Sequence, residues 1–151
     1  MGPPVDPVEA DPGLPARAEV VIIGGGIIGT CTALFLAEQG IPVVLCEKGD
    51  IAGEQSSRNW GWVRKTGRDP REIPLIIESL RLWRGMNQRV EAETGFRTTG
   101  IFFAAHDEAE LAKSAAWLDH ARPYQLDTRL LGPAEAAALF PGTTERFSGG
   151  L

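Results

Sequence analysis

The chain has 151 residues, and its 15 basic and 20 acidic side chains give a net charge of −5. This length suffices for about one hydrophobic core. The acidic balance argues against a nucleic acid as the partner. The only two cysteines, Cys31 and Cys46, are too few for a disulfide framework, so they are expected to be small buried residues in a cytoplasmic protein.

Residues 1–18 have the composition of a disordered tail. Five of the eleven prolines fall here, together with three acidic residues, and no helical or strand period is visible. No basic segment followed by an apolar one is present, so we expect no secretory signal peptide.

A strand, a helix and a second strand are predicted between residues 19 and 47. Val20–Ile23 is a run of β-branched residues, which is typical of a strand buried on both faces. A helical segment then extends to about Gln39, and Gly40 stands where a left-handed helix cap is favoured. The apolar residues 41–46 predict the second strand. Together these elements form a βαβ unit of the length of a dinucleotide-binding half.

Gly24, Gly26 and Gly29 follow the first strand with the spacing G-x-G-x-x-G. The first glycine permits a tight turn, the second admits a pyrophosphate against bare backbone, and the third brings the helix close to the sheet. Unpaired amides at the helix start favour an anion. Glu47, at the end of the second strand, is an acceptor for the two hydroxyls of an adenosine ribose, and its charge argues against NADP.

Two other interpretations of this stretch are weaker. The motif alone occurs in ordinary glycine-rich turns, but here the preceding strand, the following helix and the distant acid all fit. Residues 20–37 carry no charge and could suggest a membrane span. They barely reach the required length of about 18 residues and lack basic flanks, so we expect no membrane span.

Residues 48–67 are rich in glycine and serine and predict a loop of functional length. Basic side chains gather in and just after it: Arg58, Arg64, Lys65, Arg68 and Arg71. A charge run is often a solvated surface. Because this loop leaves the sheet beside the glycine turn, and because Trp60 and Trp62 offer flat apolar walls, contact with a ligand is favoured.

The remaining residues predict alternating helices and strands. Asp69 and Pro70 begin a helix that Gly95 ends, with its apolar residues on one face. A strand over 96–105, a helix over 107–122, a strand over 125–131 and a short helix from Pro133 are expected to follow.

With these residues in view, the chain resembles the N-terminal part of the D-amino-acid-oxidase-like flavoproteins, which include sarcosine oxidases, glycine oxidase, D-amino-acid dehydrogenases and opine oxidases. Residues 20–48, GEQSSRNWGWVR (53–64) and REIPLIIESLRLW (71–83) carry the resemblance, and TTGIFFAA (98–105) and FSGGL (147–151) add to it. It implies an α/β fold in which an incomplete Rossmann-type FAD-binding βαβ unit is followed by the start of an α+β substrate domain.

The resemblance also implies roles for individual residues. The cofactor would be FAD, held by Gly24, Gly26, Ile27, Ile28, Gly29, Glu47, Lys48, Ser56, Ser57, Arg58, Asn59 and Gly61. Arg64 would bind a substrate carboxylate, for which its planar guanidinium is suited. The ordinary alternative is that Arg64 is a surface residue or pairs with an acid such as Asp69. No metal is implied.

The resemblance implies oxidation of the C–N bond of an amino acid or an N-substituted amino acid by hydride transfer to the flavin. Proteins of this group are usually more than twice as long, so we expect a fragment: a tail (1–18), part of the FAD-binding domain (19–93) and the beginning of the substrate domain (94–151). Such a chain alone would be inactive. The alternative is a non-catalytic nucleotide-binding fragment or subunit that another chain, or a missing C-terminal half, completes.

Overall fold

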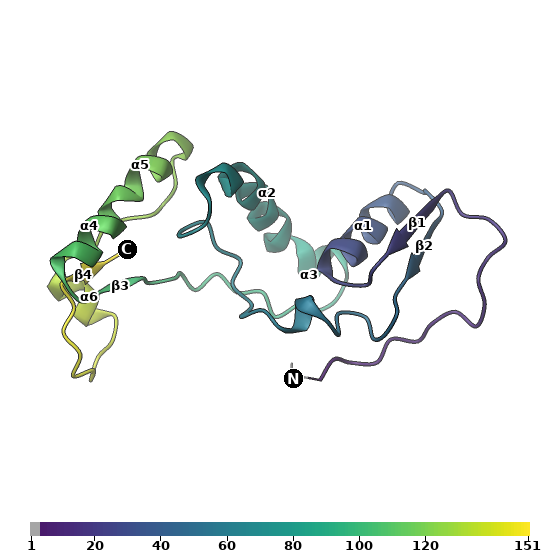
Figure 1. The fold of residues 1–151 in the computed structure, drawn as a ribbon, viewed down its shortest axis with the longest axis horizontal. Helices are drawn as coiled ribbons and strands as arrows, with labels where there is room; N and C mark the ends of the chain where they lie inside the picture. Colours follow the sequence, from purple (N-terminus) through teal and green to yellow (C-terminus); the bar gives the residue numbers. More distant parts are fainter. Residues whose placement is uncertain (1–3) are drawn as a thin grey trace. The chain divides into compact units, whose positions relative to one another are not determined.

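A computed structural model describes residues 4–151, so the first three residues of the predicted tail lie outside the described part. The chain forms two compact units, one ending at Trp62 and one comprising Val63–Leu151. Residues 4–18 form no helix or strand (Figure 1). The disorder of the tail and the domain boundary at residue 94 remain predictions.

The first unit contains the βαβ arrangement that the sequence predicts. Strand β1 (Val20–Ile23) leads through helix α1 (Ile27–Ala37) to strand β2 (Val43–Cys46), as Figure 1 shows. The two strands are parallel, with Val20 opposite Val43 and Ile23 opposite Cys46. The Rossmann-type α/β class is therefore confirmed.

The ends of these elements follow from local chemistry. Gly40 has φ +73°, the left-handed conformation expected for a residue that closes a helix, and its amide donates to the carbonyl of Ala37 at 2.9 Å. Strand β2 begins two residues later than predicted. Pro42 has no N–H for the ladder, and it contributes only its carbonyl, which accepts from Val20 at 3.2 Å.

Apolar side chains of the first unit remain exposed. Val21 is 60% exposed, Ile23 90% and Ile28 80%. Cys31 and Cys46 were predicted to be small buried residues, and the structure buries them only in part. Partial burial nevertheless raises the pKa of the Cys31 thiol, because desolvation disfavours the thiolate.

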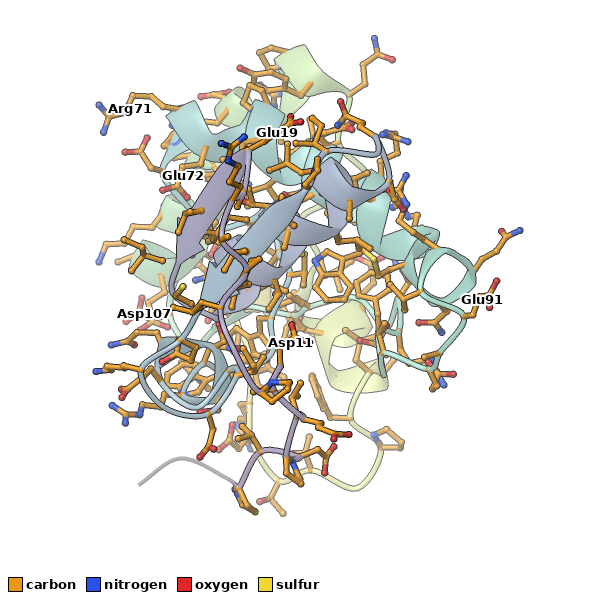
Figure 2. All side chains as sticks on the ribbon, turned by 90° about the vertical axis from the view of Figure 1, so that its right-hand side faces the viewer. Asp11, Glu19, Arg71, Glu72, Glu91 and Asp107 are labelled. Atoms are coloured by element: carbon orange, nitrogen blue, oxygen red, sulfur yellow. The ribbon has the colours of Figure 1, made fainter. Side chains whose placement is uncertain are left out.

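The second unit begins with a capped helix. The Asp69 carboxylate accepts from the Arg71 amide at 2.9 Å, a 3₁₀ turn η2 (Pro70–Glu72) follows, and helix α2 (Ile73–Arg84) continues from it. The carboxylate of Asp69 also pairs with the Arg71 guanidinium at 2.5 Å, while that arginine projects into solvent (Figure 2). The predicted helix start is confirmed.

The prediction of one uninterrupted helix from Asp69 to Gly95 was wrong. Helix α2 ends at Arg84, Gly85 separates it from the short α3 (Met86–Arg89), and no helical residue follows before residue 108. Glycine inside a helix costs about 1 kcal/mol relative to alanine, which favours a break at Gly85.

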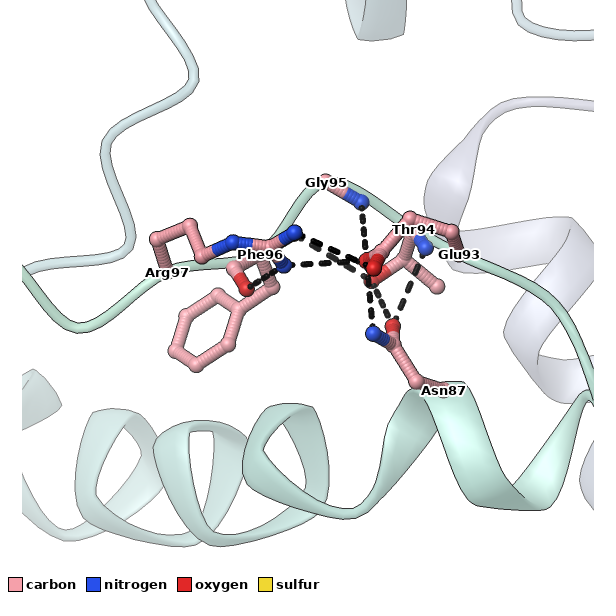
Figure 3. Close-up of polar contacts among 6 residues, drawn as sticks. All are labelled: Asn87, Glu93, Thr94, Gly95, Phe96 and Arg97. Atoms are coloured by element: carbon pink, nitrogen blue, oxygen red, sulfur yellow. Dashed lines mark hydrogen bonds and ion pairs between the residues drawn. The ribbon is translucent and has the colours of Figure 1, made fainter.

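A compact polar network closes the end of α3 (Figure 3). The Asn87 side chain donates to Glu93 at 2.6 Å and accepts from the Thr94 amide at 3.0 Å. The Glu93 carboxylate also accepts from the Gly95 amide at 3.1 Å and from Arg97 at 3.0 and 3.1 Å. These donors lower the pKa of Glu93 to about 2, the largest contribution coming from Arg97. The network fixes the turn that leads out of the helix.

The strands of the second unit are much shorter than predicted. Strand β3 (Ala104–Ala105) pairs antiparallel with β4 (Gly149–Gly150), and Leu131 forms a single bridge to Gly150. The predictions of strands over 96–105 and 125–131 were therefore wrong for most of their lengths. The sequence has strand character there, but among the described residues the strand-type backbone pairing of these two segments is limited to residues 103–105 and Leu131, which meet residues 148–151.

The other helices of this unit are α4 (Glu108–Ala116), α5 (Leu118–Ala121) and α6 (Pro133–Ala138), with a 3₁₀ turn η3 (Arg122–Tyr124). Asp107 caps α4 by accepting from the Glu110 amide at 2.8 Å. The buried apolar side chains of the unit are Ile73, Met86, Ala105, Ala121, Leu131, Ala136 and Leu151. No helix within residues 4–151 has the length and apolar character to cross a membrane.

Candidate functional site

The glycine turn lies where β1 passes into α1. Gly24 has φ +106°, a conformation that favours glycine, and its amide donates to the Cys46 carbonyl at 2.8 Å. A Cβ atom on Gly29 would lie 1.9 Å from the Gly24 carbonyl oxygen, so a side chain cannot fit there. The first and third glycines of the motif are thus required by the backbone itself.

The carboxylate of Glu47 holds this turn from the end of β2. Its Oε2 atom accepts from the Gly25 amide at 2.7 Å, and its Oε1 atom accepts from the Gly49 amide at 2.9 Å. The hydrogen bonds from Gly25 and Gly49 hold the pKa of Glu47 below its usual value of 4.5. Each carboxylate oxygen has further lone pairs, so the group can still accept hydrogen bonds from a ligand.

Ser56 joins the loop to the start of α1. It lies in the short 3₁₀ turn η1 (Gln55–Ser57), and its hydroxyl oxygen accepts from the Ile27 amide at 2.8 Å. A Cβ atom on Gly26 would lie 3.1 Å from that oxygen. Gly26 therefore leaves room between the turn and the loop.

The helix start still offers donors to an anion. The amides of Gly26, Ile28 and Gly29 have no acceptor among residues 4–151. They carry the positive end of the helix dipole, which suits a phosphate group. The fit to a dinucleotide therefore rests on two features of this structure: amides for a pyrophosphate and, at the other strand, an ionised carboxylate for ribose hydroxyls.

Two predicted cofactor residues share an acid that the sequence analysis did not single out. Lys48 lies 3.4 Å from Oε1 of Glu54, and Arg58 lies 3.2 Å from Oε2 of the same residue. All three side chains are at least half exposed, so these pairs are weak and exchangeable. In the sequence, the separation of Glu54 and Arg58 by four residues could have indicated this ion pair.

The rest of the loop is held by its own polar groups. The Ser57 hydroxyl donates to the Glu54 carbonyl at 3.0 Å, and the Asn59 amide group donates to the Ser56 carbonyl. The Asn59 side-chain oxygen accepts from the Gly61 amide at 2.5 Å, where Gly61 has φ +71°. Roles of Ser57, Asn59 and Gly61 toward FAD remain predictions.

Trp60 and Trp62 form an edge-to-face pair at the end of the first unit. Their ring centroids are 5.6 Å apart, and Trp60 is 82% exposed. This is a favourable aromatic geometry. Their predicted contact with a ligand stays a prediction.

Arg64 belongs to the second unit. Its guanidinium donates to the Thr66 carbonyl at 2.5 Å and lies 5.5 Å from the centroid of the Phe103 ring. Asp69, the acid considered as its partner in the sequence analysis, pairs with Arg71 instead. Binding of a substrate carboxylate by Arg64 remains a prediction.

Comparisons with known proteins identify the family of the chain. A family model described as DAO, FAD dependent oxidoreductase, matches residues 19–151. The match begins immediately before β1 and therefore includes the glycine turn, Glu47, Ser56 and Arg64.

Individual relatives match most of the chain. Mitochondrial sarcosine dehydrogenase of Homo sapiens is 28% identical over 133 residues, which cover 85% of this chain and 14% of that protein. The mitochondrial pyruvate dehydrogenase phosphatase regulatory subunit of Mus musculus is 30% identical over 130 residues, covering 85% and 15%.

A solved structure of L-amino acid deaminase from Proteus myxofaciens, in complex with anthranilate, superposes with a TM-score of 0.83 at 35% identity. That alignment covers 97% of this chain and 34% of the deaminase. The chain thus spans between 14% and 34% of the length of these three proteins.

Proposed function

The chain belongs to the family of FAD-dependent oxidoreductases, and from this premise we propose that it is part of an enzyme that oxidises the C–N bond of an amino acid or an N-substituted amino acid. The binding of FAD in this proposal is supported most directly by the open amides at the start of α1 and the ionised Glu47, because together they match a pyrophosphate and an adenosine ribose.

In this proposal the residues of the first unit bind and orient FAD. The amides of Gly26, Ile28 and Gly29 bind the pyrophosphate, and Glu47 accepts from the ribose. Lys48 and Arg58 would exchange Glu54 for a phosphate oxygen, since their present ion pairs are exposed and weak. Bound FAD supplies the hydride acceptor that the protein itself lacks.

The substrate is proposed to carry a carboxylate that Arg64 binds. Two names support an amino-acid substrate: sarcosine dehydrogenase and L-amino acid deaminase both act on such compounds. The half-buried guanidinium has the planar donor geometry that a carboxylate matches.

We propose the cytosol as the location, because the two cysteines are free.

A second candidate is a non-catalytic subunit. It is favoured by the similarity to a phosphatase regulatory subunit, whose name describes regulation rather than oxidation. In that case the chain would bind FAD or another adenine dinucleotide without transferring hydride, and another chain would complete it.

One experiment separates the two candidates. The full-length protein is purified, saturated with FAD and mixed under anaerobic conditions with single amino acids and N-methyl amino acids. Loss of the visible flavin absorbance with at least one of them supports the oxidoreductase. If FAD is tightly bound and is reduced by dithionite but by none of these compounds, the result would favour the non-catalytic subunit.

A further inference from the structure

Arg64 is held from two sides within the second unit. Its Nη1 atom donates to the Thr66 carbonyl at 2.5 Å, and its Cζ atom lies 5.5 Å from the centroid of the Phe103 ring. That distance is within the range of about 6 Å over which a guanidinium is attracted to an aromatic face. Both side chains are half-buried, so water screens the attraction only partly.

Gly67 leaves the space in which the two side chains meet. Its φ of +70° is a conformation that favours glycine. A Cβ atom there would lie 2.7 Å from Nη1 of Arg64 and 3.4 Å from Cζ of Phe103. A side chain at this position would therefore touch the Phe103 ring and push the Arg64 guanidinium out of place.

Separate contacts fix the two partners of Arg64. The Phe103 backbone exchanges hydrogen bonds of 2.8 and 3.0 Å with Leu151, which fixes the base of the ring. The segment that carries Arg64 is tied to residues 127–128: Lys65 pairs with Asp127 at 2.5 Å, and the Thr66 and Thr128 hydroxyls are 3.4 Å apart.

We propose that Phe103 and Gly67 are positioning residues that orient the Arg64 guanidinium for a substrate carboxylate before the substrate binds. The inference rests on the proposed role of Arg64. A guanidinium held by an aromatic face and a backbone carbonyl loses less rotamer freedom on binding, which improves the affinity for a planar, two-oxygen ligand. A neutral ligand of the same shape gains nothing from this orientation.

The test uses the full-length, FAD-loaded protein with benzoate as the carboxylate probe and benzamide as its uncharged counterpart. Binding is measured through the change in flavin absorbance. Phe103→Leu removes the aromatic face but keeps apolar volume, and Phe103→Tyr retains the face. Phe102→Leu is the matched control, because it makes the same change in a neighbouring ring that packs on Phe140 and Phe147, with ring centroids 5.4 and 5.8 Å apart.

We expect Phe103→Leu to weaken the binding of benzoate by about three- to tenfold and to leave the binding of benzamide unchanged. Phe103→Tyr should bind benzoate as tightly as the wild type does. Gly67→Ala should weaken benzoate selectively, as Phe103→Leu does, because its methyl group displaces the guanidinium. Phe102→Leu should affect both probes equally, as a packing defect would.

Arg64→Lys distinguishes the failure of this inference from that of the proposed function. If it selectively weakens benzoate while Phe103→Leu and Gly67→Ala do not, the positioning role is wrong and the carboxylate role stands. If Arg64→Lys has no selective effect, or the wild-type protein does not prefer benzoate to benzamide, the carboxylate role itself fails and the inference with it.

Discussion

Glu47 and Gly25 are joined by a hydrogen bond of 2.7 Å from the Gly25 amide to the Glu47 carboxylate, across 22 positions of sequence. The acid expected to bind a ribose therefore also holds the glycine turn against the end of β2. Gly25 is buried, and a Cβ atom there would lie 2.5 Å from Ile51. If Glu47 binds the ribose as predicted, cofactor affinity and the conformation of the turn are coupled through this side chain.

Glu47→Gln is expected to weaken FAD binding by about tenfold and to lower the melting temperature of the chain. The Gly25 and Gly49 amides donate to different carboxylate oxygens, and glutamine replaces one of these oxygens with an NH2 group that cannot accept, while the charge is also lost. Fluorescence titration of FAD and a thermal melt measure the two effects. Glu19→Gln, at an exposed carboxylate (Figure 2), is the control. Unchanged affinity in Glu47→Gln would contradict the ribose assignment.

Gly26→Val is expected to abolish FAD binding. A Cβ atom at this position already lies 3.1 Å from the Ser56 hydroxyl, and the branched side chain would fill the space next to the open amides. Gly13→Val is the matched control, since nothing lies within 4 Å of its Cβ position. A folded Gly26→Val protein that retains stoichiometric flavin would show that the pyrophosphate binds elsewhere.

Ser56→Ala is expected to destabilise the chain by about 0.5–2 kcal/mol. The hydroxyl accepts from the Ile27 amide at 2.8 Å and therefore acts as a helix cap supplied from a distant loop. Urea denaturation gives the difference. Ser57→Ala, whose hydroxyl contacts only the Glu54 carbonyl of its own loop, should cost less. Equal losses would argue that Ser56 is not a cap.

Glu93→Gln tests the network in Figure 3 through its pH dependence. Because the folded pKa of Glu93 is lowered from 4.5 to about 2, its ionised form stabilises the fold above pH 4.5. This stabilisation disappears as the pH falls from 4.5 through 2. Thermal melts of the wild type and Glu93→Gln should therefore differ at neutral pH and converge near pH 2. A difference that is constant with pH would mean that ionisation of Glu93 contributes nothing.

The 151-residue chain on its own is expected to associate in solution. Val21, Ile23 and Ile28 expose most of their apolar surface, and two strands leave open sheet edges. Light scattering should show a mass that rises with concentration, and Ile23→Lys should reduce it. Monomeric behaviour together with a sharp, cooperative melt would contradict this expectation.

The sequence alone determined the βαβ unit and predicted a nucleotide site at its glycine turn. Those features depend on local patterns: a β-branched run, glycines at fixed spacing, a helical segment closed by Gly40, and an acid after the second strand. The helix start at Asp69 and Pro70 was predictable for the same reason, since a cap acts within a few residues.

Tertiary structure decided what depends on distant partners. A strand needs another backbone to pair with, and of the predicted strand over 96–105 only residues 103–105 found one, in residues 148–151. Likewise, the sequence assigned Glu47 to a ribose, but only the fold brought it to the Gly25 amide and brought the Phe103 ring to Arg64. Local periodicity carries no information about such contacts, because their free energy arises only when remote segments meet.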